Sequence, residues 1–553
     1  MKGYLAIFLL VFLGSAYDSH TRIECASCHL MVKALREGID NNLVIRSGED
    51  FLINICSVFE HHDICQGLIR IFGKSYTEAV TGKYLNPEFV CSSFGVCPTP
   101  QYLMENFTAY EEEILKDMPE IQPWPETGDK TFMVLQVTDI HVDFFYIPGS
   151  DASCNSPLCC RNGTGNAGYW GTLGKCDVPS QTVEIFLKQV KEMENIKFVA
   201  WTGDNPPHDV WAYEREKEMD VTKKLVKMFK KELSMPVYPI IGNHECFPID
   251  LFKPDHEKQL IKELSKLWKG WLGDDQIKQF SANGFYSAFD KKTGFRILGL
   301  NNELGDLLNT WLILNNTDSA GMLAWLRKEL YSAEQKNEPV IILGHIPNGD
   351  SYMDSHWSRH YRVLANRFQN TIRGQFFGHT HNDEFFVVHS LIPGASSPGV
   401  LFAAPSFGTY TDHNPSFRLY EYDWQTHHLV NIHQYRLPLY KYRSPDDTAL
   451  FEEVFNFKDE YNMADLSPSS FEKIVEKMKT DNVFAQTYYA NWMGQYSFES
   501  NKCDERCQRY IYCRLQSDVF DEVFECDRFG APSYITSHYF YSKLQGSWEY
   551  LIE

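Results

Sequence analysis

The feature that most limits the possible folds of this chain is a set of five short polar motifs. Each motif comes directly after a strongly apolar run. In chain order they are Asp139-Ile-His141, Gly203-Asp204-Asn205, Gly242-Asn243-His244-Glu245, Gly344-His345 and Gly378-His379-Thr380-His381. The runs read as strands with helical patterns between them, which is typical of an α/β layered domain. Loops at the ends of such strands carry functional residues. We therefore expect the five motifs to meet.

The expected elements follow from the spacing of apolar residues. Strands are predicted at 132–137, 198–202, 237–241, 295–300, 340–343 and 374–377, and helices at 183–193, 214–233 and 322–333. Beyond residue 446 we expect helices, because Leu450, Phe451, Val454 and Phe455 have helical spacing and a second such run covers 471–478. The sequence thus predicts an α/β domain followed by a helical region.

The motif residues are carboxylate, amide and imidazole ligands, which suit Zn, Fe or Mn. Asp139 and His141 are two residues apart, so an extended segment points both the same way. Asp204 is the natural bridging carboxylate between two ions. Two metals about 3.5–4 Å apart are a standard device for displacement at phosphorus. A single histidine would be unremarkable, but five motifs in order predict cleavage of a phosphoester.

The N-terminus is typical of a signal peptide over residues 1–16. Lys2 precedes an apolar run at 4–13, and small residues follow at 14–16. A membrane anchor is the alternative, but this run is shorter than the ~20 residues that span a bilayer. The 15 cysteines agree with export. Three sequons, at Asn106, Asn162 and Asn315, are predicted glycosylation sites.

Charge and length limit the partners and the domain count. The 553 residues suggest two or three domains. The net charge of −21 argues against nucleic acid as a partner, because binding to phosphates needs clustered lysine and arginine. Residues 99–129 form a proline-rich linker, in which Trp124 is expected to pack against a neighbouring domain.

The five motifs resemble those of the calcineurin-like metallophosphoesterase family. The resemblance covers residues 131–382, and no ligand of the family's motif is missing there. The resemblance implies a layered β-sandwich flanked by helices, with the catalytic domain at 130–445. It also implies that one metal is held by Asp139, His141, Asp204 and His381. The second metal is then held by Asp204, Asn243, His345 and His379. We expect both ions to be Zn²⁺.

Longer stretches resemble the acid sphingomyelinase family. They are Gly203–Trp211, Gly344–Pro347, Gly378–Phe385 and Ala404–Arg418. The six cysteines of residues 20–98 are similar to those of an all-α saposin-like domain, which binds lipid in related proteins. A purely structural helical bundle is the alternative. Residues 446–553 resemble the family's helical, disulfide-bonded C-terminal subdomain. The resemblance implies a secreted or lysosomal, monomeric enzyme that contacts membranes through the saposin-like domain. It would convert sphingomyelin of membranes or lipoproteins to ceramide and phosphocholine.

The chemistry implied is attack by a hydroxide formed at the two metals, with histidine protonating the leaving alkoxide. The family places His208 and His244 on the leaving-group side. Imidazole is protonated mainly below pH ~6.5, so acidic pH should favour this role. Alternatively, His244 only orients Asn243. Tyr410 is a candidate for the substrate headgroup pocket.

Fourteen cysteines are expected to pair. The saposin-like resemblance implies Cys25–Cys97, Cys28–Cys91 and Cys56–Cys65; the other expected bridges are Cys154–Cys159, Cys160–Cys176, Cys503–Cys507 and Cys513–Cys526. Cys246 is left as a buried free thiol or, alternatively, an extra metal ligand. A further family bridge, between the 301–307 region and the loop after His345, lacks both cysteines here, which puts the rigidity of those loops in doubt.

Two other functions remain open. A nucleotide phosphodiesterase is the enzyme alternative, although such relatives typically lack a saposin-like domain. A lipid-binding protein with an inactive phosphoesterase domain is the other, and the full ligand set argues against it. A structural zinc site is a poor fit, since such sites favour four closed Cys and His ligands.

Overall fold

The computed structural model describes residues 28–33, 49–50, 52–57, 61–84, 86–87, 91, 107–313, 318–410, 412–494 and 502–528. The chain divides into two compact units, Met1–Ala109 and Tyr110–Glu553. The predicted signal peptide, the Cys25–Cys97 bridge and the sequons at Asn106 and Asn315 lie outside the described residues. Asn162 is described and exposed, so its glycosylation stays a prediction.

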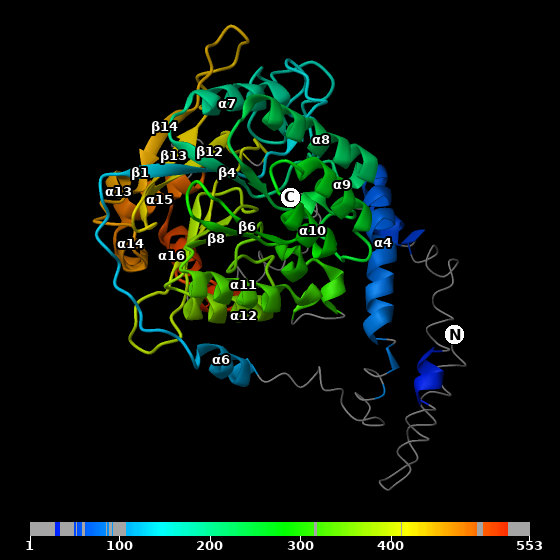
Figure 1. The fold of residues 1–553 in the computed structure, drawn as a ribbon. Helices are drawn as coiled ribbons and strands as arrows, with labels where there is room; N and C mark the ends of the chain where they lie inside the picture. The colour runs from blue at the N-terminus through cyan, green and yellow to red at the C-terminus, as the bar shows by residue number, and fades with distance from the viewer. Residues whose placement is uncertain are drawn as a thin grey trace. The chain divides into compact units, whose positions relative to one another are not determined.

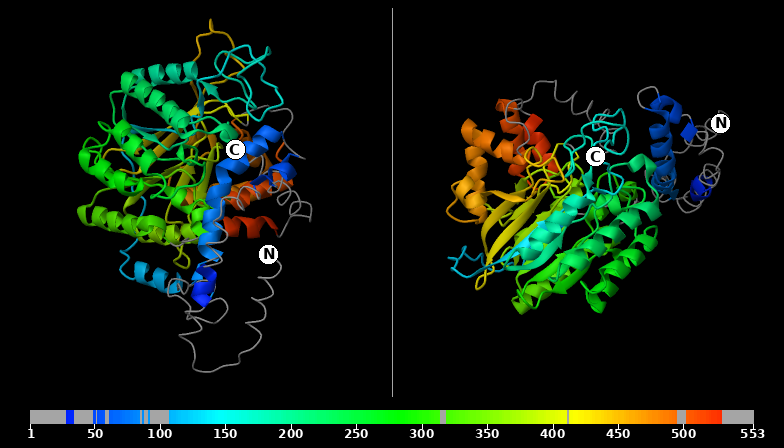
Figure 2. Two further views of the ribbon diagram at one scale, coloured as in Figure 1. Left: turned by 90° about the vertical axis from the view of Figure 1, so that its right-hand side faces the viewer. Right: turned by 90° about the horizontal axis from the view of Figure 1, so that it is seen from above.

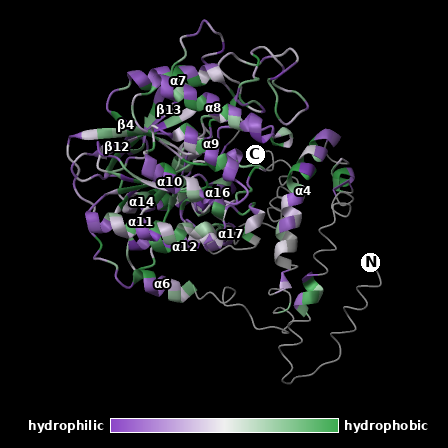
Figure 3. Ribbon diagram, turned by 45° about the vertical axis from the view of Figure 1, so that its right-hand side comes forward, coloured by the Kyte–Doolittle hydropathy of each residue, from purple (hydrophilic) through white to green (hydrophobic). Residues whose placement is uncertain are grey.

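The described part of the N-terminal unit is helical. Its longest element is α4 (His62–Tyr84), which carries both hydrophilic and hydrophobic residues (Figure 3). Two disulfides join its segments, Cys28–Cys91 and Cys56–Cys65, as expected from the cysteine pattern. Disulfides stabilise small domains that cannot bury a large core. No described helix of the protein is long and apolar enough to cross a membrane.

Two six-stranded sheets form the centre of the second unit. The first has the order β14-β13-β12-β1-β4-β5 and the second β10-β11-β9-β8-β7-β6. The first sheet's strands are β1 (Thr131–Val137), β4 (Ile196–Trp201), β5 (Val237–Pro239), β12 (Ser416–Asp423), β13 (Leu429–Arg436) and β14 (Glu452–Asn456). The second sheet's are β6 (Tyr286–Phe289), β7 (Arg296–Gly299), β8 (Val340–Leu343), β9 (Ile372–Phe377), β10 (Glu384–Val387) and β11 (Val400–Ala403). Strands β1, β4 and β5 run parallel, as do β7, β8 and β9.

Aromatic and amide side chains pack between the two sheets. Phe376 of β9 stacks on Tyr420 of β12 with ring centroids 3.9 Å apart. Gln136 of β1 is completely buried, and its amide donates to the carbonyl oxygen of Phe377 at 2.7 Å while its own oxygen accepts from the Tyr420 hydroxyl at 2.8 Å. A buried amide is tolerated because both of its ends are hydrogen-bonded. These contacts fix the two sheets face to face.

Helices cover both outer faces of this sandwich. Figure 1 shows α7 (Ser180–Glu192) and α8 (Arg215–Glu232) on one side and α11 (Met322–Lys336) and α12 (Ser355–Arg367) on the other. The remaining helices are α6 (Phe107–Leu115), α9 (Lys258–Trp268), α10 (Asp274–Asn283), α13 (Phe457–Glu460), α14 (Pro468–Thr480), α15 (Asn482–Trp492), α16 (Glu505–Leu515) and α17 (Phe520–Arg528). The orange and red C-terminal helices cluster beside the sheets in Figure 2.

The structure confirms the predicted α/β fold and each of the predicted strands and helices of the 131–382 region, with ends shifted by a few residues. Trp124 of the linker packs on His428 with ring centroids 4.6 Å apart, as expected. The helical prediction at Leu450–Phe455 is wrong, because Glu452–Asn456 form strand β14, which pairs with β13. Pairing with a preformed sheet outweighs local spacing in such a short segment. The catalytic sheet therefore runs to Asn456, beyond residue 445.

Candidate metal centre and active site

The five motifs lie directly after β1, β4, β5, β8 and β9, and the structure brings all seven predicted ligands together. Asp139, Asp204, Asn243, His141 and His345 are buried, and His381 is 8% exposed. Five of the seven have left-handed backbone: Asp139, His141, Asp204, His379 and His381 have φ between 42° and 69°. Such conformations are uncommon for residues other than glycine and collect at functional sites. The local strain directs these side chains toward one another.

Two histidines and two carboxylates form the first group of ligands. His141 Nε2 lies 3.2 Å from His381 Nε2 and 3.7 Å from Asp204 Oδ2. His381 Nε2 is also 3.7 Å from Asp139 Oδ1. Asp139 itself accepts from the backbone N–H of His379 at 2.9 Å and from the Thr138 hydroxyl at 2.5 Å. Its carboxylate is thus oriented before any ion binds.

The second group shares Asp204 with the first. His345 Nε2 lies 3.1 Å from Asp204 Oδ2 and 2.8 Å from Asn243 Oδ1, and His379 Nδ1 is 3.0 Å from the same amide oxygen. The Asn243 amide N–H donates to Asp250 Oδ1 at 2.8 Å, which turns its oxygen toward the histidines. Ligand-capable atoms of Asp204, His345 and His379 all lie within 4.8 Å of one another.

The donor chemistry of both groups fits cations. The Nδ1–H of His141 donates to the carbonyl oxygen of Pro206 at 2.8 Å, and that of His345 donates to the carbonyl oxygen of Thr202 at 2.7 Å. Nε2 of each ring then faces other acceptors, namely oxygens of Asp204 and Asn243, and without a proton this nitrogen can bind a metal. Metal-binding histidines are typically fixed by such a hydrogen bond at the other nitrogen. A divalent cation satisfies the facing lone pairs.

Burial and charge shift the pKa values of these groups in opposite directions. Burial lowers the pKa of His141 and of His381 well below the ordinary value, and lowers that of His379 to about 4. Burial also opposes a charge on His345, but nearby carboxylates, above all Asp204, raise its pKa well above normal. Burial raises the pKa of Asp139 to about 7. His141, His379 and His381 are therefore neutral, as metal ligands must be, whereas His345 and Asp139 would release their protons when a metal binds.

His208 lies beside the ligand groups and is completely buried. Its Nδ1 and its backbone N–H both donate to Asp177, each at 2.7 Å. Its Nε2 is buried without a hydrogen-bond partner, and one nitrogen of its ring lies within 4.8 Å of ring nitrogens of His141 and His381. The ring of Tyr410 stacks on the His208 ring at 4.2 Å with a 13° interplanar angle. One face of this imidazole is thus covered, and its free nitrogen faces the ligands.

His244 is held from its other side by a tyrosine. The Tyr213 hydroxyl donates to the Pro207 carbonyl oxygen at 2.9 Å and so accepts from Nδ1–H of His244 at 2.6 Å. Ligand-capable atoms of His244, His141 and Asp204 lie within 4.8 Å of one another. The ring centroids of His208 and His244 are 4.9 Å apart. The two candidate acids are therefore neighbours on one side of the ligand groups.

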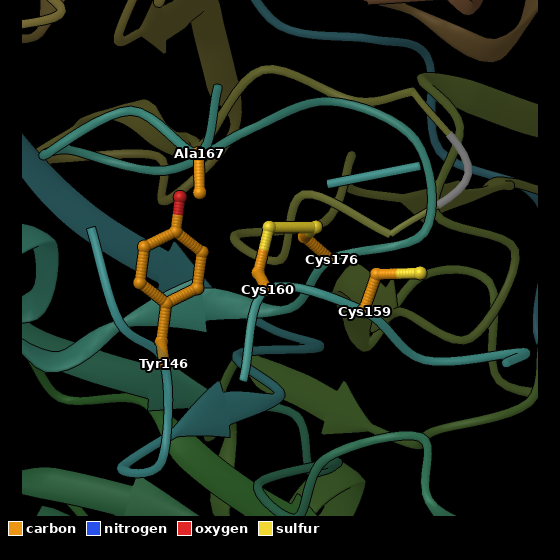
Figure 4. Close-up of a cluster of buried hydrophobic side chains, with 5 residues drawn as sticks. All are labelled: Tyr146, Cys159, Cys160, Ala167 and Cys176. Carbon is orange, nitrogen blue, oxygen red and sulfur yellow. A yellow bond between two sulfur atoms is a disulfide. The ribbon is translucent and has the colours of Figure 1, made fainter. Parts of the chain in front are cut away.

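A disulfide-bonded loop between β2 (Val142–Asp143) and β3 (Val178–Pro179) carries Asp177. Figure 4 shows the Cys160–Cys176 disulfide near Tyr146 in a small buried cluster of this loop. The Tyr146 hydroxyl donates to the Gly168 carbonyl oxygen at 2.8 Å, and Cys154–Cys159 forms a second bridge. Cys160–Cys176 ends one residue before Asp177. The bridge thus steadies the carboxylate that holds His208.

Sequence reasoning missed the residues that position the ligands. The clearest is Glu245, whose carboxylate accepts from the backbone N–H groups of Asp204, Asn205 and Gly242 at 3.0, 2.7 and 2.7 Å. It thereby ties the loops that carry Asp204 and Asn243. Its place inside the third motif was a signal, whereas Asp177, Tyr213 and Asp250 are single polar residues in loops and gave none.

The expected bridges Cys503–Cys507 and Cys513–Cys526 are present, and Cys246 is a buried free cysteine, as predicted. Hydrogen bonds connect the two loops that lack the further disulfide. The backbone N–H of Leu307 donates to the Tyr352 carbonyl oxygen at 2.5 Å, and that of Asp354 to the Gly305 carbonyl oxygen at 2.8 Å. The Asn302 side chain accepts from the backbone N–H of His345 at 2.7 Å. These bonds hold the His345 loop in place.

Comparisons with known proteins agree with this geometry. The family model described as calcineurin-like phosphoesterase matches residues 132–383, and that described as acid sphingomyelin phosphodiesterase C-terminal region matches 397–526. The chain is 30% identical to sphingomyelin phosphodiesterase of Homo sapiens, over 91% of this chain and 83% of that protein. It is 28% identical to sphingomyelin phosphodiesterase A of Dictyostelium discoideum, over 92% of each chain.

Two further matches are weaker, one to a protein named for another substrate and one to a solved structure. A cyclic GMP-AMP phosphodiesterase of Bos taurus is 27% identical over 73% of this chain and 92% of that protein. Among solved structures, a dimetal phosphatase from Danio rerio is 15% identical with a TM-score of 0.35, covering 59% of this chain and 98% of that one. That structural likeness is too low to carry an argument.

Proposed function

The chain belongs to the acid sphingomyelin phosphodiesterase family within the calcineurin-like phosphoesterases, and from this premise we propose that it hydrolyses sphingomyelin to ceramide and phosphocholine. The observation that carries the proposal is the match to sphingomyelin phosphodiesterases over more than nine-tenths of the chain. The relative named for cyclic GMP-AMP spans only 73% of this chain. The nucleotide alternative is therefore the weaker one.

The residues support a two-metal site in which Asp139, His141, Asp204 and His381 hold one ion. Asp204, Asn243, His345 and His379 hold the other. When bound, such ions lower the pKa of water and stabilise negative charge on phosphodiester oxygens. Zn²⁺ suits this mixture of imidazole and oxygen ligands. Element analysis of the purified protein tests the identity of the metal, and iron or manganese in its place would replace zinc in this proposal.

His208 and His244 are proposed to protonate the ceramide oxygen as it leaves. Asp177 keeps the Nδ1–H of His208 bound, so a second proton on this ring sits on Nε2, the nitrogen that faces the ligands. Tyr213 fixes His244 in the same way through Nδ1. Both rings thus present Nε2 as the donor, and Tyr410 holds the His208 ring flat while lining the headgroup pocket.

The N-terminal unit is proposed to contact the lipid surface, as a saposin-like module. Apolar side chains of its described helices are exposed: Leu30 by 70%, Leu52 by 50% and Ile55 by 47%. Exposed apolar groups that gather in one small unit are typical of interaction sites. Deleting residues 20–98 should therefore reduce turnover of sphingomyelin in liposomes more than turnover of a soluble phosphocholine ester. Equal losses on both substrates would refute this role.

We further propose a secreted or lysosomal, monomeric protein, supported by the signal-like N-terminus and the disulfides. Immunolocalisation tests the location, and size-exclusion chromatography with light scattering tests the monomeric state.

The substrate is tested by a panel of sphingomyelin liposomes, ATP and a cyclic dinucleotide under the same conditions. Phosphocholine release from sphingomyelin with slow nucleotide turnover supports the proposal. The reverse preference would move the assignment to a nucleotide phosphodiesterase.

A further inference from the structure

One arginine of the C-terminal helices reaches two loops of the candidate metal centre. Arg514, in α16, donates through Nε to Glu384 Oε1 at 2.5 Å and through Nη2 to Glu384 Oε2 at 3.0 Å. The same Nη2 donates to Asp350 Oδ2 at 2.5 Å. The three side chains are only 8%, 1% and 6% exposed. This is a buried network of one cation and two carboxylates.

Each carboxylate belongs to a loop that carries metal ligands. Asp350 follows His345 in the loop between β8 and α12, and Glu384 follows His381 at the start of β10. These loops leave the neighbouring parallel strands β8 and β9. His345 and His379 meet at Asn243, whereas His381 faces His141. The spacing of the two loops therefore sets how the histidines meet.

Other contacts place the C-terminal helices on the same loops. Gly349 has φ +78°, and a Cβ there would lie 2.6 Å from the Ser517 carbonyl oxygen, so this loop rests directly on the segment after α16. Trp492 of α15 donates to Glu384 Oε1 at 2.7 Å. Tyr488 donates to the Asp383 carbonyl oxygen at 3.2 Å. The C-terminal helices are thus part of the wall that supports the ligand loops.

Without the arginine, Asp350 and Glu384 would be two buried negative charges close to each other. In a low-dielectric interior they repel strongly, and water cannot enter freely to screen them. The loops would separate, and the left-handed backbone at His379 and His381 would lose its support. Ligands are sensitive to such displacement, because second partners of metal sites fix ligand orientation.

We propose that Arg514 is a positioning residue of the metal centre, which ties the His345 loop to the His379–His381 loop from the C-terminal subdomain. The inference rests on the proposed two-metal function. It assigns the C-terminal helices a part in holding the metals, besides their part in folding.

The test measures metal retention by the full-length protein. Zinc-loaded wild type, Arg514→Met, Arg514→Lys and Asp350→Asn are mixed with the chromogenic chelator 4-(2-pyridylazo)resorcinol, and zinc release is followed by absorbance. The matched control is Arg367→Met. Arg367 is also buried in an ion pair, but its partner is Glu334 of α11 and not a residue of a ligand loop. Thermal unfolding of each variant is recorded alongside.

We expect Arg514→Met to lower zinc affinity by about 10- to 100-fold, as for other partners of metal ligands. Asp350→Asn should show a smaller loss, since Arg514 keeps Glu384, and Arg514→Lys should restore part of the affinity. Arg367→Met should retain zinc like wild type even if it unfolds at a lower temperature. If Arg514→Met does not fold, Asp350→Asn decides.

Zinc retention equal to wild type in both Arg514→Met and Asp350→Asn would overturn the proposal that Arg514 connects the two ligand loops. So would an equal loss of zinc in Arg367→Met, because the effect would then follow general destabilisation. Wild type that binds no metal at all would overturn the proposed metal centre itself, and this inference with it.

Discussion

His208 Nδ1 lies 2.7 Å from Oδ1 of Asp177, and both side chains are completely buried. This pair fixes which ring nitrogen of His208 carries the proton toward Asp177 and which remains for the substrate side. Replacing Asp177 with Asn keeps the shape but removes the charge. We expect sphingomyelin turnover to fall by about 100-fold or more, the usual contribution of a positioned acid.

The leaving group separates this role from a structural one. A 4-nitrophenolate leaves without a proton, so Asp177→Asn should affect 4-nitrophenyl phosphocholine much less than sphingomyelin. Asp290→Asn is the matched control, because Asp290 is also buried and holds the turn between β6 and β7. Equal losses on both substrates in Asp177→Asn would contradict the acid role of His208.

Glu245 connects the loops of Asp204 and Asn243 through three backbone hydrogen bonds. In Glu245→Gln one oxygen becomes an NH₂ group that faces backbone N–H donors. We expect a loss of about 1–3 kcal/mol of stability and a decrease of about 10- to 100-fold in metal affinity. Thermal unfolding and chelator competition measure the two. Glu257→Gln, a buried carboxylate paired with Arg215, serves as control and should lose stability without losing metal.

Glu218 of α8 gives a pH dependence of stability that is independent of the metals. Burial, with Asp209 nearby, raises its pKa from 4.5 to about 8. The folded protein therefore binds a proton that the unfolded chain releases above pH ~4.5. This stabilising contribution is complete below pH ~4.5 and is lost as the pH rises through about 8. The protein should be more stable in acid, by about 3–5 kcal/mol from this residue.

Melting temperatures of wild type and Glu218→Gln across this range test the linkage. The variant should match wild type near pH ~4.5 and exceed it near pH ~8, because it carries no charge to bury. Glu216→Gln, an exposed neighbour on the same helix, should leave the profile unchanged. A constant difference between Glu218→Gln and wild type at every pH would rule out the raised pKa.

The sequence predicted the ligand set because each ligand stands in a short motif after an apolar run. Asp139 and His381 follow β1 and β9, which belong to different sheets. The rule that loops after parallel strands carry functional residues needs no structure, whereas the packing of the two sheets that brings these loops together does. Asp177 and Tyr213 were not predicted, since a single polar residue in a long loop has no periodic signal. Arg514 depends on how the C-terminal helices pack, which local patterns do not encode.

Strand β14 is the element whose conformation the sequence pattern predicted wrongly. Phe451 and Phe455 have helical spacing, but only Phe455 lies within β14, and its neighbours Val454 and Asn456 are half-buried at the sheet. Hydrogen bonds to β13 decided the conformation of these few residues. Short apolar segments cannot be assigned from period alone.

Hydrolysis of sphingomyelin at a two-metal site is tested most directly by measuring phosphocholine release from sphingomyelin in mixed liposomes. It is made at about pH 5 and about pH 7.5, where imidazole protonation differs most, with and without a chelator. His381→Ala serves as the variant that lacks one ligand. We expect release that is greater at acidic pH, is abolished by the chelator and is absent in His381→Ala. Release that survives both the chelator and the substitution would contradict the two-metal site.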